Sequence, residues 1–269
     1  LGRRAVILDE RLFIEKCITA VPDDPLPRLG KATLHLLKNR YGKAESLLTE
    51  IIRSAPEILS AQAKFGGLLN DQQRDDEFIS WHQALPVDAD QHPEIWYVRG
   101  CFLSRLRRND EAARCFIETL TRSPNHVEAT YMLSQSLQAS GKSELALLTA
   151  KRSERLASAE TTMSTLAHGV NVEEMKRAAF QLAELERYWE ASSMCYLVID
   201  GFSSRETWAE SGLQDYIALL DRDVSFKPGT VPVSGLRLKD FPLPDWSRVT
   251  VEPKTEVSPP GMSGISFVE

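Results

Sequence analysis

Residues 93–126, PEIWYVRGCFLSRLRRNDEAARCFIETLTRSPNH, decide the fold of this chain. The segment carries Gly100 and Leu103 in its first half, Ala112 and Phe116 in its second half, and Pro124 near its end. Small residues let the two helices of a hairpin approach closely, large apolar residues fill the layer between neighbouring hairpins, and proline stops the second helix. The pattern therefore predicts a helix hairpin that is one unit of a stack.

The same columns recur when the chain is read in steps equal to the length of this segment. The column of Gly100 holds Ala32, Gly66 and Ser134 in the other units, and a further unit follows with Ala179 in that column. One hairpin cannot bury its apolar face alone, so three or more must stack. The periodicity therefore predicts an all-α array of helix hairpins.

This pattern resembles the tetratricopeptide repeat (TPR) family, whose signature has Trp, small, large, Ala, aromatic and Pro at these intervals and whose period is about 34 residues. The resemblance implies a right-handed superhelical solenoid of helix hairpins with a non-helical, Pro-rich C-terminal tail. We expect the array to span 1–221 and the tail to span 222–269. Within the array we expect hairpins near 1–24, 25–58, 59–92, 93–126, 127–157 and 172–203, and a cap helix at 204–221.

The tail differs in composition from the array. Seven of the 14 prolines lie between Lys227 and Pro260, where they oppose helix formation. Because aromatic residues such as Phe241 and Trp246 accompany them, the tail is either an extended strap packed on the array or a disordered segment. In the first case these two rings could also fill the groove of the array. The closing segment 264–268 resembles the lead-in to FG-GAP propeller modules, which implies an extracytoplasmic multidomain parent.

Composition and motifs argue against several function classes. The net charge of -6 argues against nucleic-acid binding, and no apolar run is long enough to cross a bilayer, so we expect no membrane insertion. The four cysteines form no C-x-x-C pair, the five histidines are scattered, and no nucleotide-binding or nucleophile motif occurs. We therefore expect no cofactor, no metal site and no catalytic residue. The chain starts without a Met, so it is expected to be a piece of a longer protein.

In the family, the first helices of successive repeats line a concave surface on which peptides lie. Carried over to this register, the resemblance implies a groove lined by Lys64, Asn70, Tyr97, Arg105, Tyr131, Gln135 and Gln138. The columns that hold a carboxylate clamp in some family members contain Ala63, Gly67 and Cys101 here, which argues against chaperone-tail binding. An alternative is that Tyr97 and Tyr131 only cover the seam between repeats.

The leading functional hypothesis is a non-enzymatic scaffold that binds a protein or peptide partner in the concave groove. One alternative is a structural spacer or docking arm of a larger extracytoplasmic protein. Another is a regulatory array for a catalytic domain outside this chain. Weak self-association through Trp208 and its helix is a further hypothesis. The compartment is expected to be extracytoplasmic if the propeller resemblance holds and cytoplasmic otherwise.

Overall fold

A computed structural model describes residues 10–169, 171–201, 207–220 and 232–249, and these residues contain α-helices and short 3-10 helices but no strand. The predicted propeller lead-in at 264–268 lies outside the described residues. The α-helices are α1 (Glu10–Ala20), α2 (Pro25–Leu37), α3 (Tyr41–Ser54), α4 (Leu59–Asp71), α5 (Asp75–Gln83), α6 (Pro93–Arg105), α7 (Asn109–Arg122), α8 (Val127–Ala139), α9 (Ser143–His168), α10 (Val172–Glu184), α11 (Tyr188–Gly201) and α12 (Thr207–Leu220). The 3-10 helices are η1 (Val87–Gln91), η2 (Leu238–Asp240) and η3 (Trp246–Arg248).

The helix starts repeat with a constant period. The first helices α2, α4, α6 and α8 begin at Pro25, Leu59, Pro93 and Val127, which are evenly spaced along the chain. The second helices α3, α5, α7 and α9 each begin at the same distance in sequence from the start of their first helix, and α10 and α11 keep this spacing. The prediction of an all-α helical-repeat solenoid is confirmed.

The turn inside each hairpin also repeats. Asn39, Gln73, Arg107, Gly141 and Glu186 occupy equivalent turn positions, and all have φ between 53° and 74°. The next residue in each turn donates its N–H to a carbonyl in the last turn of the first helix, as Arg108 does to Leu103 at 2.9 Å. Such a bond ends a helix with a left-handed residue. Only one of the five turns uses glycine, so the sequence gives little sign of this shared conformation.

The closest approach of two helices in a hairpin depends on glycine. A Cβ on Gly100 in α6 would lie 2.6 Å from the ring of Phe116 in α7, so only glycine fits under that ring. In the preceding hairpin, a Cβ on Gly66 would lie 2.4 Å from Trp81. One repeat period before Phe116 the sequence has His82, but the neighbouring Trp81 makes the contact instead.

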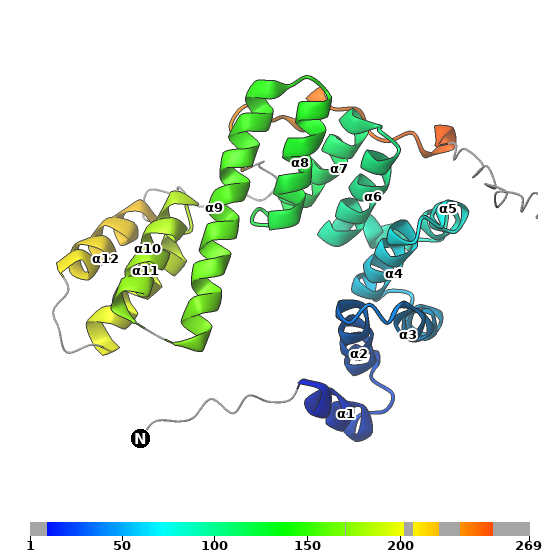
Figure 1. Cartoon of the computed structure of the whole chain (residues 1–269), viewed down its shortest axis with the longest axis horizontal. Coiled ribbons are helices and arrows are strands. Elements are labelled where there is room, and N and C mark those ends of the chain that lie inside the picture. The colour runs from blue at the N-terminus through cyan, green and yellow to red at the C-terminus, as the bar shows by residue number, and fades with distance from the viewer. Residues whose placement is uncertain (1–9, 170, 202–206, 221–231, 250–269) are drawn as a thin grey trace, which may run out of the picture.

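The array has the shape of an arch (Figure 1). One limb is formed by α1–α5 and the crown by α6–α8, and the other limb begins with α9. The 26 residues of α9 make it long enough to serve two units: its first half packs on α8, and Leu156 and Ala159 pack with Leu185 of the α10–α11 turn. The helix ends at His168, before Gly169.

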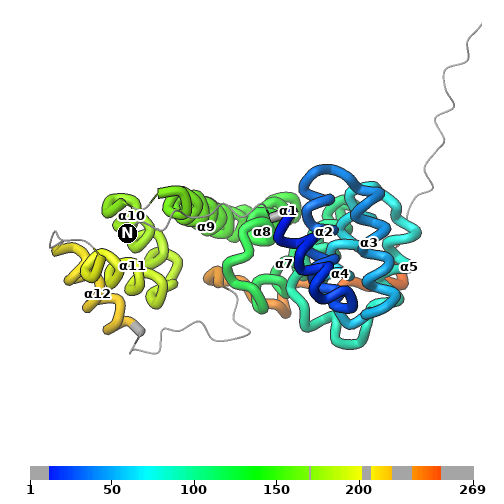
Figure 2. Tube along the Cα trace, turned by 90° about the horizontal axis from the view of Figure 1, so that it is seen from below, coloured from blue at the N-terminus to red at the C-terminus, as the bar shows by residue number. Residues whose placement is uncertain are grey.

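Residues 232–249, which we call the strap, run across the outer side of the array from α9 past α7 toward α5 (Figure 2). Val233, Leu236 and Phe241 of the strap are buried in the same apolar cluster as Ala113 and Ile117 of α7. The strap therefore belongs to the hydrophobic core although it contains only short 3-10 helices.

Candidate functional site

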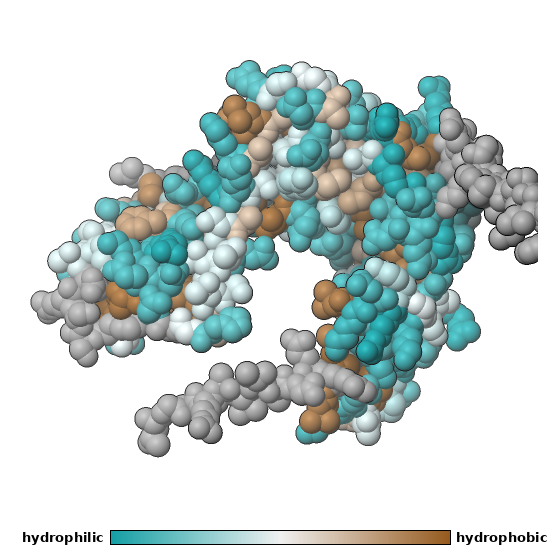
Figure 3. Space-filling model, viewed as in Figure 1, coloured by the Kyte–Doolittle hydropathy of each residue, from teal (hydrophilic) through white to brown (hydrophobic). Residues whose placement is uncertain are grey.

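The first helices line the inner side of the arch. In Figure 1, α2 and α4 lie on the inner side of their limb, with α3 and α5 outside them. The space-filling view shows a hollow between the limb of α1–α4 and the limb that starts with α9 (Figure 3). We refer to the inner faces of α4, α6 and α8 as the concave surface.

The three side chains of α8 that the resemblance assigns to the groove are open to solvent. Tyr131 is 53% exposed, and Gln135 and Gln138 are exposed one and two turns further along. An exposed tyrosine offers a large apolar ring and a hydrogen-bonding hydroxyl, and an amide can both donate and accept. These three side chains can therefore contact a polypeptide without any change in the fold.

Tyr97 of α6 lies deeper than Tyr131. Its ring is half-buried, 4.8 Å from the ring of His126 and 6.0 Å from the ring of Phe116. Burial raises the pKa of its hydroxyl, which therefore stays protonated. Tyr97 therefore covers the seam between two repeats, whereas Tyr131 is largely exposed.

A carboxylate and an imidazole lie beside Tyr97. Nδ1 of His126 accepts the N–H of Ala129 at 3.2 Å, which leaves Nε2 as the donor, 3.1 Å from Glu94. The hydrogen bond from His126, and more weakly the charge of Lys64, hold the pKa of Glu94 below its ordinary value. Glu94 is therefore a fixed negative charge on the concave surface. Sequence reasoning missed it, although the pair of a histidine and a glutamate two positions later recurs in the next unit, where it ends at Glu128.

Arg105 and Asn70 contact each other, and their contacts connect helices of the array. Nε of Arg105 donates to Asn70 at 3.3 Å, its other nitrogens bind Asp75, and its guanidinium lies over the ring of Phe102. These contacts join α4, α5 and α6. The charge of Arg105 is thus neutralised within the array, and a ligand would meet Asn70 and Arg105 as a rigid polar edge.

The cysteine on this surface is not activated. Burial raises the pKa of the Cys101 thiol to about 11, and Asp71 nearby has its own pKa raised by burial. A thiol with that pKa is protonated near neutrality and is a poor nucleophile. Among the described residues, no group of three or more His, Cys, Asp or Glu side chains could hold a metal ion.

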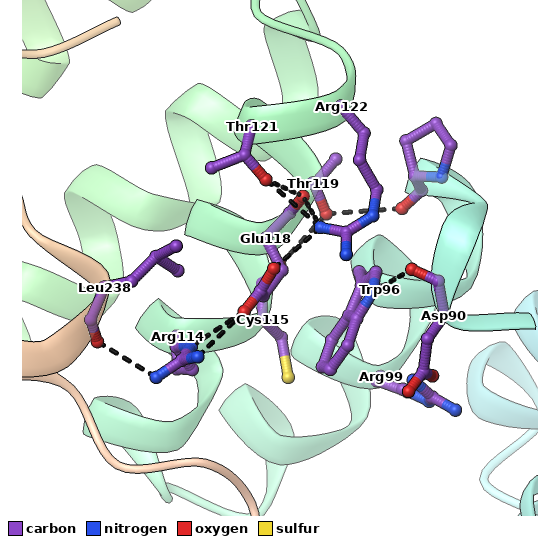
Figure 4. A network of polar contacts seen from close by, with 11 residues as sticks. Asp90, Trp96, Arg99, Arg114, Cys115, Glu118, Thr119, Thr121, Arg122 and Leu238 are labelled. Carbon is purple, nitrogen blue, oxygen red and sulfur yellow. Dashed lines mark hydrogen bonds and ion pairs between the residues drawn. The ribbon is translucent and has the colours of Figure 1, made fainter. Parts of the chain in front are cut away.

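The strap is anchored on the opposite side of the array. Arg114 of α7 donates to the carbonyls of Leu238 and Phe241 at 3.0 and 3.1 Å and pairs with Glu118, which also binds Arg122 (Figure 4). This network lies on a second helix. The alternative that Phe241 or Trp246 fills the groove is therefore wrong: Phe241 is buried with Ala113 and Ile117 of α7, and the ring of Trp246 lies against His82 of α5 and near Phe102 of α6.

Trp208 is the residue on which the self-association hypothesis rests. It is half-buried in the cluster of α10–α12, with Phe180 at 6.4 Å and Lys176 over its ring at 5.9 Å. The most exposed aromatic residue among the described residues of this end is Trp189 on α11, at 69%, and Tyr196 and Phe180 are also exposed. In the described part of the chain, no helix is both long enough and apolar enough to span a membrane.

Comparison with known proteins gives a likeness in fold alone. No protein-family model matches the chain, and no curated protein does. Among solved structures, MamA AMB-1 aligns with 55% of this chain and 87% of its own, at 20% identity and a TM-score of 0.41. MamA MSR-1 aligns with 55% and 84%, at 20% identity and 0.39, and a further MamA structure aligns with 72% and 97%, at 10% identity and 0.40. At these values no functional conclusion passes from those proteins to this one.

The chain's own geometry defines its class. Evenly spaced helix starts, a shared turn and a glycine under an aromatic ring are the features of a helical-repeat solenoid of tetratricopeptide type.

Proposed function

We propose that this chain is a protein-interaction scaffold that binds an extended or helical peptide of a partner protein on its concave surface. The observation that carries the proposal is the separation of the two sides of the array. The strap packs against second helices of the array, whereas Tyr131, Gln135 and Gln138 remain exposed on α8, a first helix. The preferred partner has donors that can reach Glu94 and an apolar side chain that can cover Tyr131.

We keep the division into an array at 1–221 and a tail at 222–269 as a proposal. In support, α12 ends at Leu220 and residues 232–249 contain only short 3-10 helices, although three of these residues are buried in the core of the array. The alternatives of a spacer, a propeller-bearing parent and a regulatory array for an outside catalytic domain concern sequence beyond this chain. A spacer role by itself does not require exposed aromatic and amide side chains on the inner side.

Selection of peptides from a random display library against the full chain tests the binding function. Selected peptides are then titrated calorimetrically into the wild type and into the variant Tyr131→Ala/Gln135→Ala/Gln138→Ala. Because all three side chains are exposed, the variant should keep the wild-type melting temperature. We expect its affinity to fall by about tenfold or more.

The matched control is Ser193→Ala/Tyr196→Ala/Leu197→Ala, which removes exposed side chains from α11. This control should bind as the wild type does. The proposal fails if the selected peptides bind the α8 variant with unchanged affinity, or if no peptide is selected.

A further inference from the structure

The outer side of the array has crevices between neighbouring second helices, and the strap puts an aromatic ring into two of them. Phe241 lies between α7 and α9: Arg114 binds its carbonyl, and Lys142 lies 5.2 Å from its ring. Trp246 lies five residues further on, 3.9 Å from His82 of α5 and 6.3 Å from the ring of Phe102. This side of the array therefore binds an extended segment whose aromatic side chains are spaced along it.

A corresponding crevice between α1 and α3 forms a cavity of about 430 Å³. In the register of the repeats, Leu34 on its wall is equivalent to Phe102, the ring next to Trp246. The cavity is lined by Glu15, Lys31, Leu34, His35, Lys38, Arg40, Lys43, Ser46 and Leu47. Its volume falls within the range of sites that enclose a small ligand or a few side chains.

The charge of this cavity departs from the pattern of the other turns. Arg74, Arg108 and Arg187 each follow the left-handed turn residue, and each forms an ion pair with a glutamate three residues later. Arg40 has the same place in its turn, but the residue three positions later is Lys43. The first hairpin therefore has a cation where three others have a carboxylate.

The positive charges of the cavity are poorly balanced. Lys31 pairs with Glu15 at 2.9 Å, but within the described residues Lys38, Arg40 and Lys43 form no ion pair. Burial, and then the charges of Lys43, Arg40, Lys31 and Lys38, lower the pKa of His35. The chain as a whole carries a net charge of -6, so this concentration of cations is local. A positive cavity in an acidic protein attracts an anionic ligand.

We propose that the cavity between α1 and α3 binds an extended acidic segment of a partner protein, which seats an aromatic side chain against Leu34 and Leu47. The acidic side chains of that segment pair with Lys38, Arg40 and Lys43. The binding mode copies the one by which the strap occupies the crevices next to α7, with carboxylates added to match the cations. The cavity is lined by residues of α1, α2, α3 and the turn between α2 and α3, whereas the concave surface belongs to α4, α6 and α8. The two sites are therefore separate, and each can fail without the other.

Fluorescence anisotropy with a dye-labelled Glu-Glu-Phe-Glu-Glu peptide tests the site on the full chain. We expect saturable binding at about 50 mM salt that weakens strongly at about 300 mM. The variant Lys38→Gln/Arg40→Gln/Lys43→Gln should bind about tenfold or more weakly. Its melting temperature should stay near that of the wild type, since all three cations are exposed and, within the described residues, form no ion pair.

The control variant Lys16→Gln/Arg53→Gln/Lys239→Gln removes the same charge from exposed positions outside the cavity and should bind as the wild type does. Two control peptides separate the contributions: Gln-Gln-Phe-Gln-Gln lacks the carboxylates, and Glu-Glu-Ala-Glu-Glu lacks the ring. Both should bind at least about fivefold more weakly than the probe.

Four results would overturn the proposal. The first two are no binding of the probe peptide up to about 1 mM, and a loss of affinity in the control variant equal to that of the cavity variant. The other two are an affinity for a control peptide equal to that for the probe, and tighter binding of the probe by the variant Glu252→Gln/Glu256→Gln than by the wild type. The last result would mean that the chain's own acidic C-terminal residues, and not a partner, compete for the cavity.

Discussion

At the scale of single residues, Gly100 is the position where the hairpin tolerates no side chain. Its absent Cβ would lie 2.6 Å from a ring carbon of Phe116, which is fully buried and cannot move away cheaply. We expect Gly100→Ala to lower the free energy of unfolding by about 1–3 kcal/mol, measured by urea denaturation.

Gly42 in α3 is the matched control, because a Cβ there meets nothing within 4 Å. Gly42→Ala should be neutral or stabilise the protein by up to about 1 kcal/mol, since alanine is the better helix former. Equal destabilisation by both substitutions would contradict the packing argument.

His82 makes stability depend on pH. Burial, and then the charge of Arg99, lower its pKa to about 4, and its Nδ1 accepts a hydrogen bond from Nε of Arg99 at 3.3 Å. As pH falls from about 6.5 toward 4, the unfolded chain binds a proton at His82 and the folded chain does not. Folding stability should therefore decrease over this window, by up to about 3 kcal/mol from this residue.

Urea denaturation at pH 7 and pH 4.5 measures this effect. His82→Gln should show a smaller decrease between the two pH values than the wild type. His168→Gln, which changes an exposed histidine at the end of α9, should match the wild type. An unchanged pH dependence in His82→Gln would show that other groups cause the decrease.

The two tyrosines of the concave surface should differ in their effect on stability. Tyr97 packs on His126 and Phe116, so Tyr97→Ala should cost about 2–3 kcal/mol. Tyr131 is 53% exposed, so Tyr131→Ala should cost less than about 0.5 kcal/mol. Thermal denaturation of the two variants checks this, and similar melting temperatures would mean that Tyr97 contributes no packing energy.

At the scale of elements, the strap is held by apolar burial as well as by Arg114. Phe241 is buried, so Phe241→Ala should lower the free energy of unfolding by about 3 kcal/mol. Leu243 is 59% exposed two residues away, and Leu243→Ala should change it by less than about 0.5 kcal/mol. If urea denaturation gives the same value for both variants, the strap does not contribute to folding stability.

The sequence of α7 indicates a buried outer face, but the repeat period alone does not say what covers it. Ala113, Ile117 and Thr121 are buried on α7, whereas the equivalent residues of α3 include the exposed Thr49 and Arg53. A second helix with an apolar outer face needs a cover. The helical period shows that such a face exists, but only the structure shows that the strap is what covers it.

At the scale of the whole molecule, stability is unevenly distributed. Among the described residues, the largest fully buried side chains all lie between Leu48 and Leu137. The unit of α10–α12 has a smaller cluster, built around Met175, Cys195 and Val198. In a solenoid each unit is stabilised mainly by its neighbours, so the units with less buried area open more easily.

Hydrogen exchange measured by mass spectrometry should show this order. Amides of α6–α8 should exchange slowest and those of α11 and α12 faster, because the latter open without global unfolding. A single common exchange rate for all helices would mean that the array unfolds as one cooperative unit.

The sequence by itself determined the class of fold, the period of the repeats and the helix crossing at Gly100, because these follow from local spacing of small, large and helix-stopping residues. Contacts between residues distant in sequence were decided only by the tertiary structure. Examples are the packing of Trp81, in place of His82, on Gly66, the pairing of Arg105 with Asp75, and the strap on the outer side. A repeat pattern fixes which face of a helix is buried, but the identity of what buries it depends on long-range packing that no local period encodes.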